Sequence, residues 1–239
     1  MTQRAAATPA SNSKPSVAVL AARLQGLARL VAAADWVIGS DEAGYGTWAG
    51  DLIVCGIAVA KDWSDSRVTD SKSLTDRARR EVVMTYKSST RILKVIHRTS
   101  PREVDERGVW ASAISAHNEV HRALEEKLRA VQPGVAFVHV VDGFENARSK
   151  LDARITPIAK ADTFVPAVSL ASCFAKVVQC ELMNRAAERF PGYGFESHRG
   201  YGTPQHRKAI EALGVVDIHR RSYRPIRELI SNGPPPHRG

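Results

Sequence analysis

The sequence predicts an α/β domain in which a mixed central β-sheet is flanked by helices. Its 239 residues, 44% of them hydrophobic, are enough for one domain with a sizeable core. Short apolar, β-branched runs of strand length alternate with longer segments of helical spacing, which is typical of α/β proteins. The runs of strand length are 36–39, 52–60, 91–97 and 135–141.

The first 34 residues differ from the rest in composition. Residues 1–15 are rich in Ala, Ser, Thr and Pro and are predicted to be a disordered tail. Leucines recur at helical spacing in 16–34, which predicts a short amphipathic helix. An acid-poor N-terminus that contains arginine is also typical of an organelle transit peptide, although this one has few charges and the predicted domain starts directly after it.

A glycine-rich stretch connects the first two predicted strands, so a β-hairpin is the expected connection. A helix with Ser73 or Thr75 as N-cap is predicted to end near Tyr86, before the third strand. Residues 101–130 predict one long helix with an apolar stripe. The fourth strand follows and ends at Asp142.

The second half begins with a predicted helix over 166–189, which has a proline in its first turn. A polar stripe runs along this helix, and the simplest interpretation is its solvent face. A shorter helix is predicted over 204–213, with Gly214 as its C-cap. The domain is expected to span 35–230, and the Pro-rich residues 231–239 are predicted to be a disordered tail.

Paired carboxylates mark the end of the first strand. Asp41 and Glu42 would point to opposite faces of a regular strand, so they share one site only if the strand bends or stops there. Gly44 and Gly46 permit such a bend and allow a backbone to approach a ligand closely. The alternative from this stretch alone is a β-turn with two solvated acids.

Two further acids, Asp142 and Asp162, follow an apolar strand or precede a helix, where a mixed sheet would bring them close to Asp41 and Glu42. Four carboxylates in one place repel one another unless cations neutralise them, and oxygen-only ligands favour Mg²⁺ or Mn²⁺ over zinc. Two such ions activate water and stabilise the leaving oxygen of a phosphodiester. This set therefore predicts a nuclease.

The charge distribution is consistent with a polyanionic partner. The net charge is +9, and residues 184–239 hold ten Lys or Arg against five acids. A solvated basic face is the alternative. Three cysteines without CxxC spacing favour a reducing compartment, and we expect a cytoplasmic protein. No apolar run reaches the ~18 residues of a membrane-spanning helix.

Eight motifs in order resemble type 2 ribonuclease H, and most closely ribonuclease HII, over about residues 36–225. Each motif is short, but all of them occur in the order of that family. They are Asp-Glu-Ala-Gly-x-Gly (41–46), Asp-Ser-Lys-x-Leu (70–74), Asp-Gly (142–143), Lys-Ala-Asp (160–162), Ala-Ser-x-x-Ala-Lys (171–176), Pro-Gly-Tyr-Gly-Phe (191–195), His-Arg-Gly-Tyr-Gly-Thr (198–203) and His-Arg-x-Ser-Tyr (219–223).

The resemblance implies an RNase H-like fold with a helical C-terminal extension. It implies a monomeric enzyme that hydrolyses the RNA strand of RNA/DNA hybrids and ribonucleotides embedded in duplex DNA, as in DNA replication and repair, leaving a 3′-hydroxyl. Two divalent ions, Mg²⁺ or Mn²⁺, would be the cofactors. The implied metal-binding catalytic set is Asp41, Glu42, Asp142 and Asp162. The implied nucleic-acid contacts are Gly44, Tyr45, Gly46, Lys72, Ser172, Lys176 and Tyr201.

Two positions depart from the ribonuclease HII pattern. Tyr45 stands where that pattern has arginine, which is closer to ribonuclease HIII, whereas Tyr201 and the short N-terminal leader favour type HII. Cys180 stands where relatives often carry aspartate. Two alternatives therefore remain: a ribonuclease HIII-like preference for RNA runs, and a protein that binds hybrids without cleaving them. The presence of all four carboxylates argues against the second.

Overall fold

The computed structural model describes residues 17–68, 74–147 and 150–231 and has five strands in one mixed sheet. The strands are β1 (Trp36–Ala43), β2 (Leu52–Ala60), β3 (Leu93–Thr99), β4 (Phe137–Asp142) and β5 (Ile155–Ile158). Their order is β3-β2-β1-β4-β5. The pairs β1/β2 and β2/β3 are antiparallel, whereas β1/β4 and β4/β5 are parallel. The predicted hairpin and mixed sheet are confirmed.

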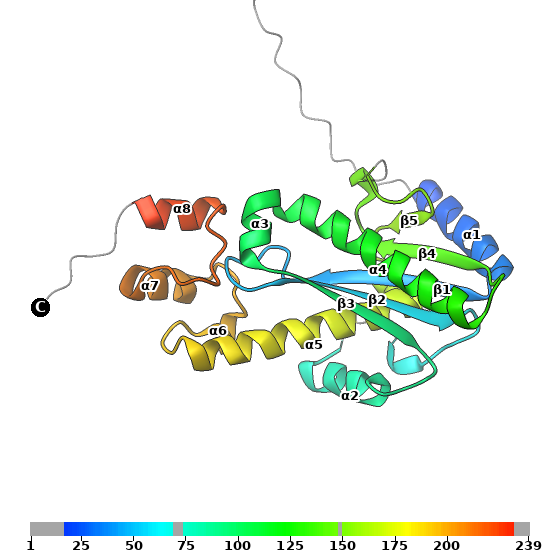
Figure 1. Ribbon diagram of the computed structural model, residues 1–239, viewed down its shortest axis with the longest axis horizontal. Helices are drawn as coiled ribbons and strands as arrows, with labels where there is room; N and C mark the ends of the chain where they lie inside the picture. The colour runs from blue at the N-terminus through cyan, green and yellow to red at the C-terminus, as the bar shows by residue number, and fades with distance from the viewer. Residues whose placement is uncertain (1–16, 69–73, 148–149, 232–239) are drawn as a thin grey trace, which may run out of the picture.

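Helices cover both faces of this sheet (Figure 1). They are α1 (Val17–Ala33), α2 (Asp76–Tyr86), α3 (Pro101–Arg107), α4 (Val109–Val131), α5 (Pro166–Arg189), α6 (Phe195–His198), α7 (Pro204–Leu213) and α8 (Arg224–Ser231). On one face of the sheet, α5 packs through buried residues such as Val168 and Ala171. On the other face, Leu124 and Leu128 of α4 pack against Ile38.

The C-terminal helices α6 to α8 form a separate small core at one end of the molecule, at the opposite end from α1 (Figure 1). Phe195 and Ile226 are fully buried there, together with Ala49 from the loop between β1 and β2. This loop is therefore built into the C-terminal part of the fold. The contact brings the sequence around 44–50 next to residues more than 150 positions away along the chain.

The prediction of one helix over 101–130 is wrong, because the chain forms two. Ser100 and Glu103 form a capping box at the start of α3. Gly108 then adopts a φ of 82°, a left-handed value that ends α3 and begins α4 in a new direction. Thr75 caps α2 as expected, by accepting a hydrogen bond from the backbone N–H of Ala78.

Some predicted segments lie outside the described residues, and some observed elements were not predicted. Residues 69–73, which include Lys72, and the proposed tails lie outside the described residues, except that Ser231 is the last residue of α8. The short strand β5 and helix α8 were not singled out from the sequence. Within the described ranges, no helix has the length and apolar composition needed to cross a membrane.

Candidate active site

Three aspartates from separate segments meet at one end of the sheet. Asp41 is on β1, Asp142 is the last residue of β4, and Asp162 is in a 3₁₀ turn that follows β5. Because β1 and β4 are parallel neighbours, their carboxyl ends lie side by side. One carboxylate oxygen from each aspartate lies within 4.8 Å of the others. The predicted convergence of these three acids is therefore present in the structure.

The environment of Asp41 opposes its negative charge. Burial, followed by the neighbouring Glu42 and Asp142 carboxylates, raises the pKa of Asp41 well above its usual value. Two hydrogen bonds act in the other direction, one from the Ser172 hydroxyl and one of 2.8 Å from the Glu42 N–H to Oδ1. A bound cation would relieve the repulsion, and an all-carboxylate set fits a hard divalent ion such as Mg²⁺ or Mn²⁺.

Glu42 lies beside this cluster but points to the other face of the sheet. The strand does not stop at Asp41, since β1 stays paired with β2 as far as Ala43. Side chains therefore continue to alternate, and Glu42 faces α4. There its Oε2 lies 3.3 Å from Nε2 of His117. The expected bend is absent, and His117 is a neighbour of the site that the sequence did not single out.

The glycine-rich loop after β1 is held from the C-terminal segment. Gly44 has a φ of 83°, and a Cβ there would lie 2.7 Å from the Asp51 carbonyl oxygen, so only glycine fits. The Tyr45 carbonyl accepts hydrogen bonds from Nη1 of Arg220 (3.0 Å) and from the Tyr223 hydroxyl (2.8 Å). A Cβ at Gly46 would meet no atom within 4 Å, so this part of the loop is open to a ligand.

The polar stripe on α5 is not the solvent face of that helix. Ser169 and Gln179 are buried, and the half-buried Ser172 hydroxyl contacts Asp41. The Lys176 ammonium lies 5.5 Å from the centre of the Tyr201 ring, which is 42% exposed. The stripe therefore joins the aspartates to the segment that carries Tyr201.

Cys180 is also buried on α5, and its sulfur lies 3.7 Å from Oε1 of Gln179. The Gln179 amide donates a 2.8 Å hydrogen bond to the Arg199 carbonyl. This bond links α5 to the His-Arg-Gly-Tyr segment. The thiol thus lies next to a side chain that supports the site.

Comparisons with known proteins agree on one family. The sequence profile described as Ribonuclease HII matches residues 38–225. Ribonuclease HII of Halorhodospira halophila is 34% identical over 195 residues, which cover 81% of this chain and 94% of that protein. Among solved structures, ribonuclease H2 of Pyrococcus horikoshii is similar with a TM-score of 0.60 at 22% identity, covering 82% of this chain and 98% of that one.

A second structural relative is Bst-RNase HIII in complex with Mn²⁺. It has a TM-score of 0.61 at 18% identity, and the match covers 82% of this chain and 70% of that one. At this level of identity the two structures show a shared fold, which is the RNase H-like fold. The profile and the sequence relative together show that the chain belongs to the ribonuclease HII family and is an endonuclease of the ribonuclease H type.

Proposed function

We propose that this protein hydrolyses the RNA strand of RNA/DNA hybrids and ribonucleotides embedded in duplex DNA, leaving a 3′-hydroxyl. The observation that carries this proposal is the convergence of the Asp41, Asp142 and Asp162 oxygens within 4.8 Å. Glu42 points to the other face of β1, but its charge still raises the pKa of Asp41, and we propose that it completes the set from that side. The family of the chain supplies the class of substrate.

The four acids are proposed to hold two divalent ions, Mg²⁺ or Mn²⁺. The Mn²⁺ complex of the Bst-RNase HIII relative supports this choice. When bound, such ions supply a nucleophile from water and stabilise charge at the scissile phosphate. The hydrogen bond from the Ser172 hydroxyl lowers the pKa of Asp41 and so opposes part of the rise that burial causes.

Recognition of the ribonucleotide is assigned to the loop that contains Gly44 and Gly46. The backbone N–H groups of this loop are proposed to approach the 2′-hydroxyl, the group that separates RNA from DNA, and the open space at Gly46 supports this. Tyr201 is proposed to stack on the neighbouring deoxyribose, and Lys176 and Ser172 to lie near phosphates. The charge of Lys176 next to the exposed Tyr201 ring supports this pairing of a stacking and an anion-binding group.

Because of Tyr45, we expect the protein to cleave RNA runs moderately faster than single embedded ribonucleotides. Burial, and then the Glu42 charge, raises the pKa of the Tyr45 hydroxyl, so it stays a neutral donor at pH 7. An arginine at this position would add a charged fork of donors. The hydrogen bonds from Arg220 and Tyr223 hold the loop backbone whatever side chain stands at 45. Recognition of the 2′-hydroxyl is therefore expected to survive, with weaker anchoring of a phosphate.

The test is cleavage of two labelled duplexes in Mg²⁺ or Mn²⁺, one a full RNA/DNA hybrid and one a DNA duplex with a single ribonucleotide. We expect both to be cleaved and EDTA to abolish the reaction. Asp142→Asn should lower the rate by several orders of magnitude while hybrid binding persists. Asp217→Asn is the matched control, because Asp217 is an exposed acid paired with Arg189. Full activity of Asp142→Asn, or hybrid binding without any cleavage by the unmodified protein, would refute the proposal.

A further inference from the structure

A row of polar side chains is buried between the sheet and α4, next to the carboxylates. We call it the buried histidine row. Its members are Ser40, His117, His121 and His139, with exposed fractions of 0, 0, 2 and 5%. Polar groups buried to this extent are costly unless each finds a hydrogen-bond partner.

Each member of the row contacts the next at hydrogen-bond distance. Nδ1 of His139 lies 3.1 Å from Nδ1 of His121, and Nε2 of His121 lies 2.8 Å from the Ser40 hydroxyl. That hydroxyl lies 2.8 Å from Nδ1 of His117. Nε2 of His117 then faces the Glu42 carboxylate at 3.3 Å. The row therefore ends on an acid of the proposed active site.

With neutral imidazoles, only one set of proton positions satisfies the four contacts from His139 to Glu42. The ionised Glu42 only accepts, so His117 donates from Nε2 and its Nδ1 is bare. The Ser40 hydroxyl must then donate to that Nδ1 and accept from Nε2 of His121. His121 is left with a bare Nδ1, which accepts from His139. All four donors therefore point toward Glu42, and the bare Nε2 of His139 is left facing Oε2 of Glu125 at 3.6 Å, which is beyond hydrogen-bond distance.

The surroundings keep the distant members of the row neutral. Burial is the main cause that lowers the pKa of His121 well below its usual value, and the neighbouring His139 lowers it further. Burial also lowers the pKa of His139. Beyond His139, the Glu125 carboxylate is paired with Arg129 and Arg154.

We propose that His117 is a positioning residue, and that its Nε2–H group, held in place by Ser40 and His121, fixes the Glu42 carboxylate on the α4 side of the three aspartates. This inference rests on the proposed function, because the orientation of Glu42 matters only if that acid belongs to the metal-binding set. A glutamate side chain has several rotatable bonds, and β1 itself directs it away from Asp41. The Phe144 ring, whose centre lies 5.0 Å from that of His117, supports the imidazole from the edge.

The first test measures Mn²⁺ binding to the substrate-free protein by isothermal titration calorimetry. His117→Leu removes the donor at similar volume and should weaken Mn²⁺ binding at least about tenfold, as is usual when a hydrogen-bond partner of a metal ligand is lost. In hybrid cleavage at saturating metal, kcat should fall and KM should change less than about twofold. His117→Gln places an amide N–H near the position of Nε2 and should restore Mn²⁺ affinity to within about threefold.

The matched control is Val120→Ala, which creates a cavity on the same helix against β2 without touching the row. It should lower Tm but leave Mn²⁺ affinity unchanged. If His117→Leu binds Mn²⁺ as Val120→Ala does, or if Gln and Leu at 117 behave alike, the positioning role is refuted. Should His117→Leu fail to fold, Ser40→Ala decides instead, because it removes the support of His117 and should weaken Mn²⁺ binding about threefold.

A double-mutant cycle separates positioning from general destabilisation. If His117 acts through Glu42, then adding His117→Leu to Glu42→Gln should lower kcat/KM little further, whereas independent effects would add. Additive losses would overturn the inference. The proposed function fails in a different way, namely if the unmodified protein neither binds Mn²⁺ nor cleaves the hybrid.

Discussion

Arg220→Met removes the guanidinium that joins the C-terminal segment to the glycine-rich loop. The Arg220 side chain is fully buried. Its Nε and Nη2 donate to the Gly50 carbonyl at 3.1 and 2.9 Å, and its Nη1 donates to the Tyr45 carbonyl and the Tyr223 hydroxyl at 3.0 and 2.9 Å. The variant therefore loses four hydrogen bonds, three of which hold the loop between β1 and β2.

The expected loss in the free energy of unfolding follows from the hydrogen bonds that are removed. A hydrogen bond to a charged group contributes about 1.5–3 kcal/mol, but four bonds from one guanidinium do not add fully. The substitution also removes both donors to the buried Gly50 carbonyl, which costs a further amount of about 1–3 kcal/mol, whereas the Tyr45 carbonyl keeps its hydrogen bond from the Tyr223 hydroxyl. Methionine refills part of the volume. We therefore expect Arg220→Met to lower the free energy of unfolding by about 4 kcal/mol.

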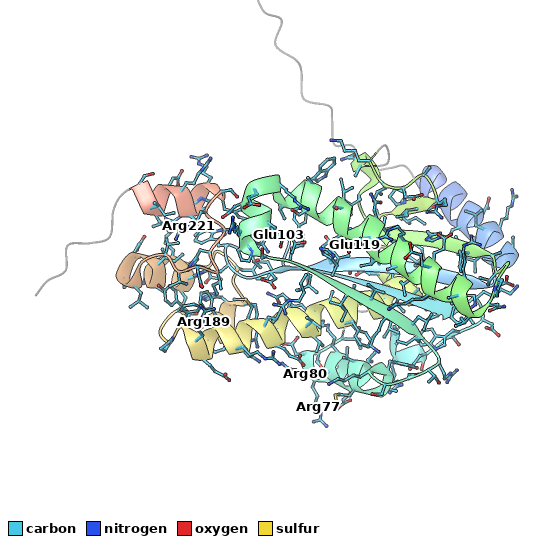
Figure 2. All side chains as sticks on the ribbon, in the orientation of Figure 1. Arg77, Arg80, Glu103, Glu119, Arg189 and Arg221 are labelled. Atoms are coloured by element: carbon cyan, nitrogen blue, oxygen red, sulfur yellow. The ribbon has the colours of Figure 1, made fainter. Side chains whose placement is uncertain are left out.

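Urea unfolding followed by circular dichroism measures this loss. Arg221→Met is the control, since Arg221 is an exposed arginine at the same end of the molecule (Figure 2). It should change the free energy of unfolding by no more than about 0.5 kcal/mol. Where Arg220→Met still folds, KM for the hybrid should rise because the loop is no longer held. A loss below about 1 kcal/mol with an unchanged KM would refute the assigned role of Arg220.

Three further predictions concern specificity, salt and acid. Tyr45→Arg should raise cleavage of a single embedded ribonucleotide about five- to thirtyfold relative to an RNA run, the effect of about 1–2 kcal/mol from a charged donor; an unchanged ratio of the two rates contradicts this. Hybrid affinity should fall with salt at a log–log slope near −0.9 per phosphate neutralised, because residues 184–239 carry an excess of base; a slope near zero would exclude phosphate contacts. Burial lowers the pKa of His206 and His219 to about 4 from the ordinary 6.5, so the unfolded chain binds more protons between these values. The free energy of unfolding should therefore fall between pH 6.5 and 5 by about 1.5 kcal/mol for one histidine and by less than twice that for the pair, whose Nε2 atoms lie 3.1 Å apart; urea titrations that agree at both pH values would refute this.

Local patterns predicted the regular elements well. The bounds of β2, α5 and α7 agree with the ranges expected from apolar runs, from Pro166 and from Gly214. The meeting of Asp41 and Asp142 was expected because a mixed sheet gathers acids from the ends of apolar strands, and the parallel pairing of β1 with β4 is the structural reason for it. These features depend on residues near one another in sequence or on the topology of the sheet.

Features that depend on contacts between distant residues were missed. Gly108 is compatible with a helix interior, and only its left-handed φ separates α3 from α4. Ser169 and Gln179 form a polar stripe that a sequence pattern assigns to solvent, although both are buried. His117 could not be paired with Glu42 because they are 75 positions apart. The only local signal was the spacing of His117 and His121, which places both on one face of α4.

The adjacent acids Asp41 and Glu42 are contacted from opposite faces of the sheet, because β1 stays regular between them. Asp41 points toward α5 and accepts a hydrogen bond from Ser172, whereas Glu42 points toward α4 and meets His117. Each acid therefore contacts a different helix. Substitutions on the inner face of α4 should disturb Glu42 while leaving the three aspartates together. Substitution of Ser172 should act on Asp41 and leave the buried histidine row intact.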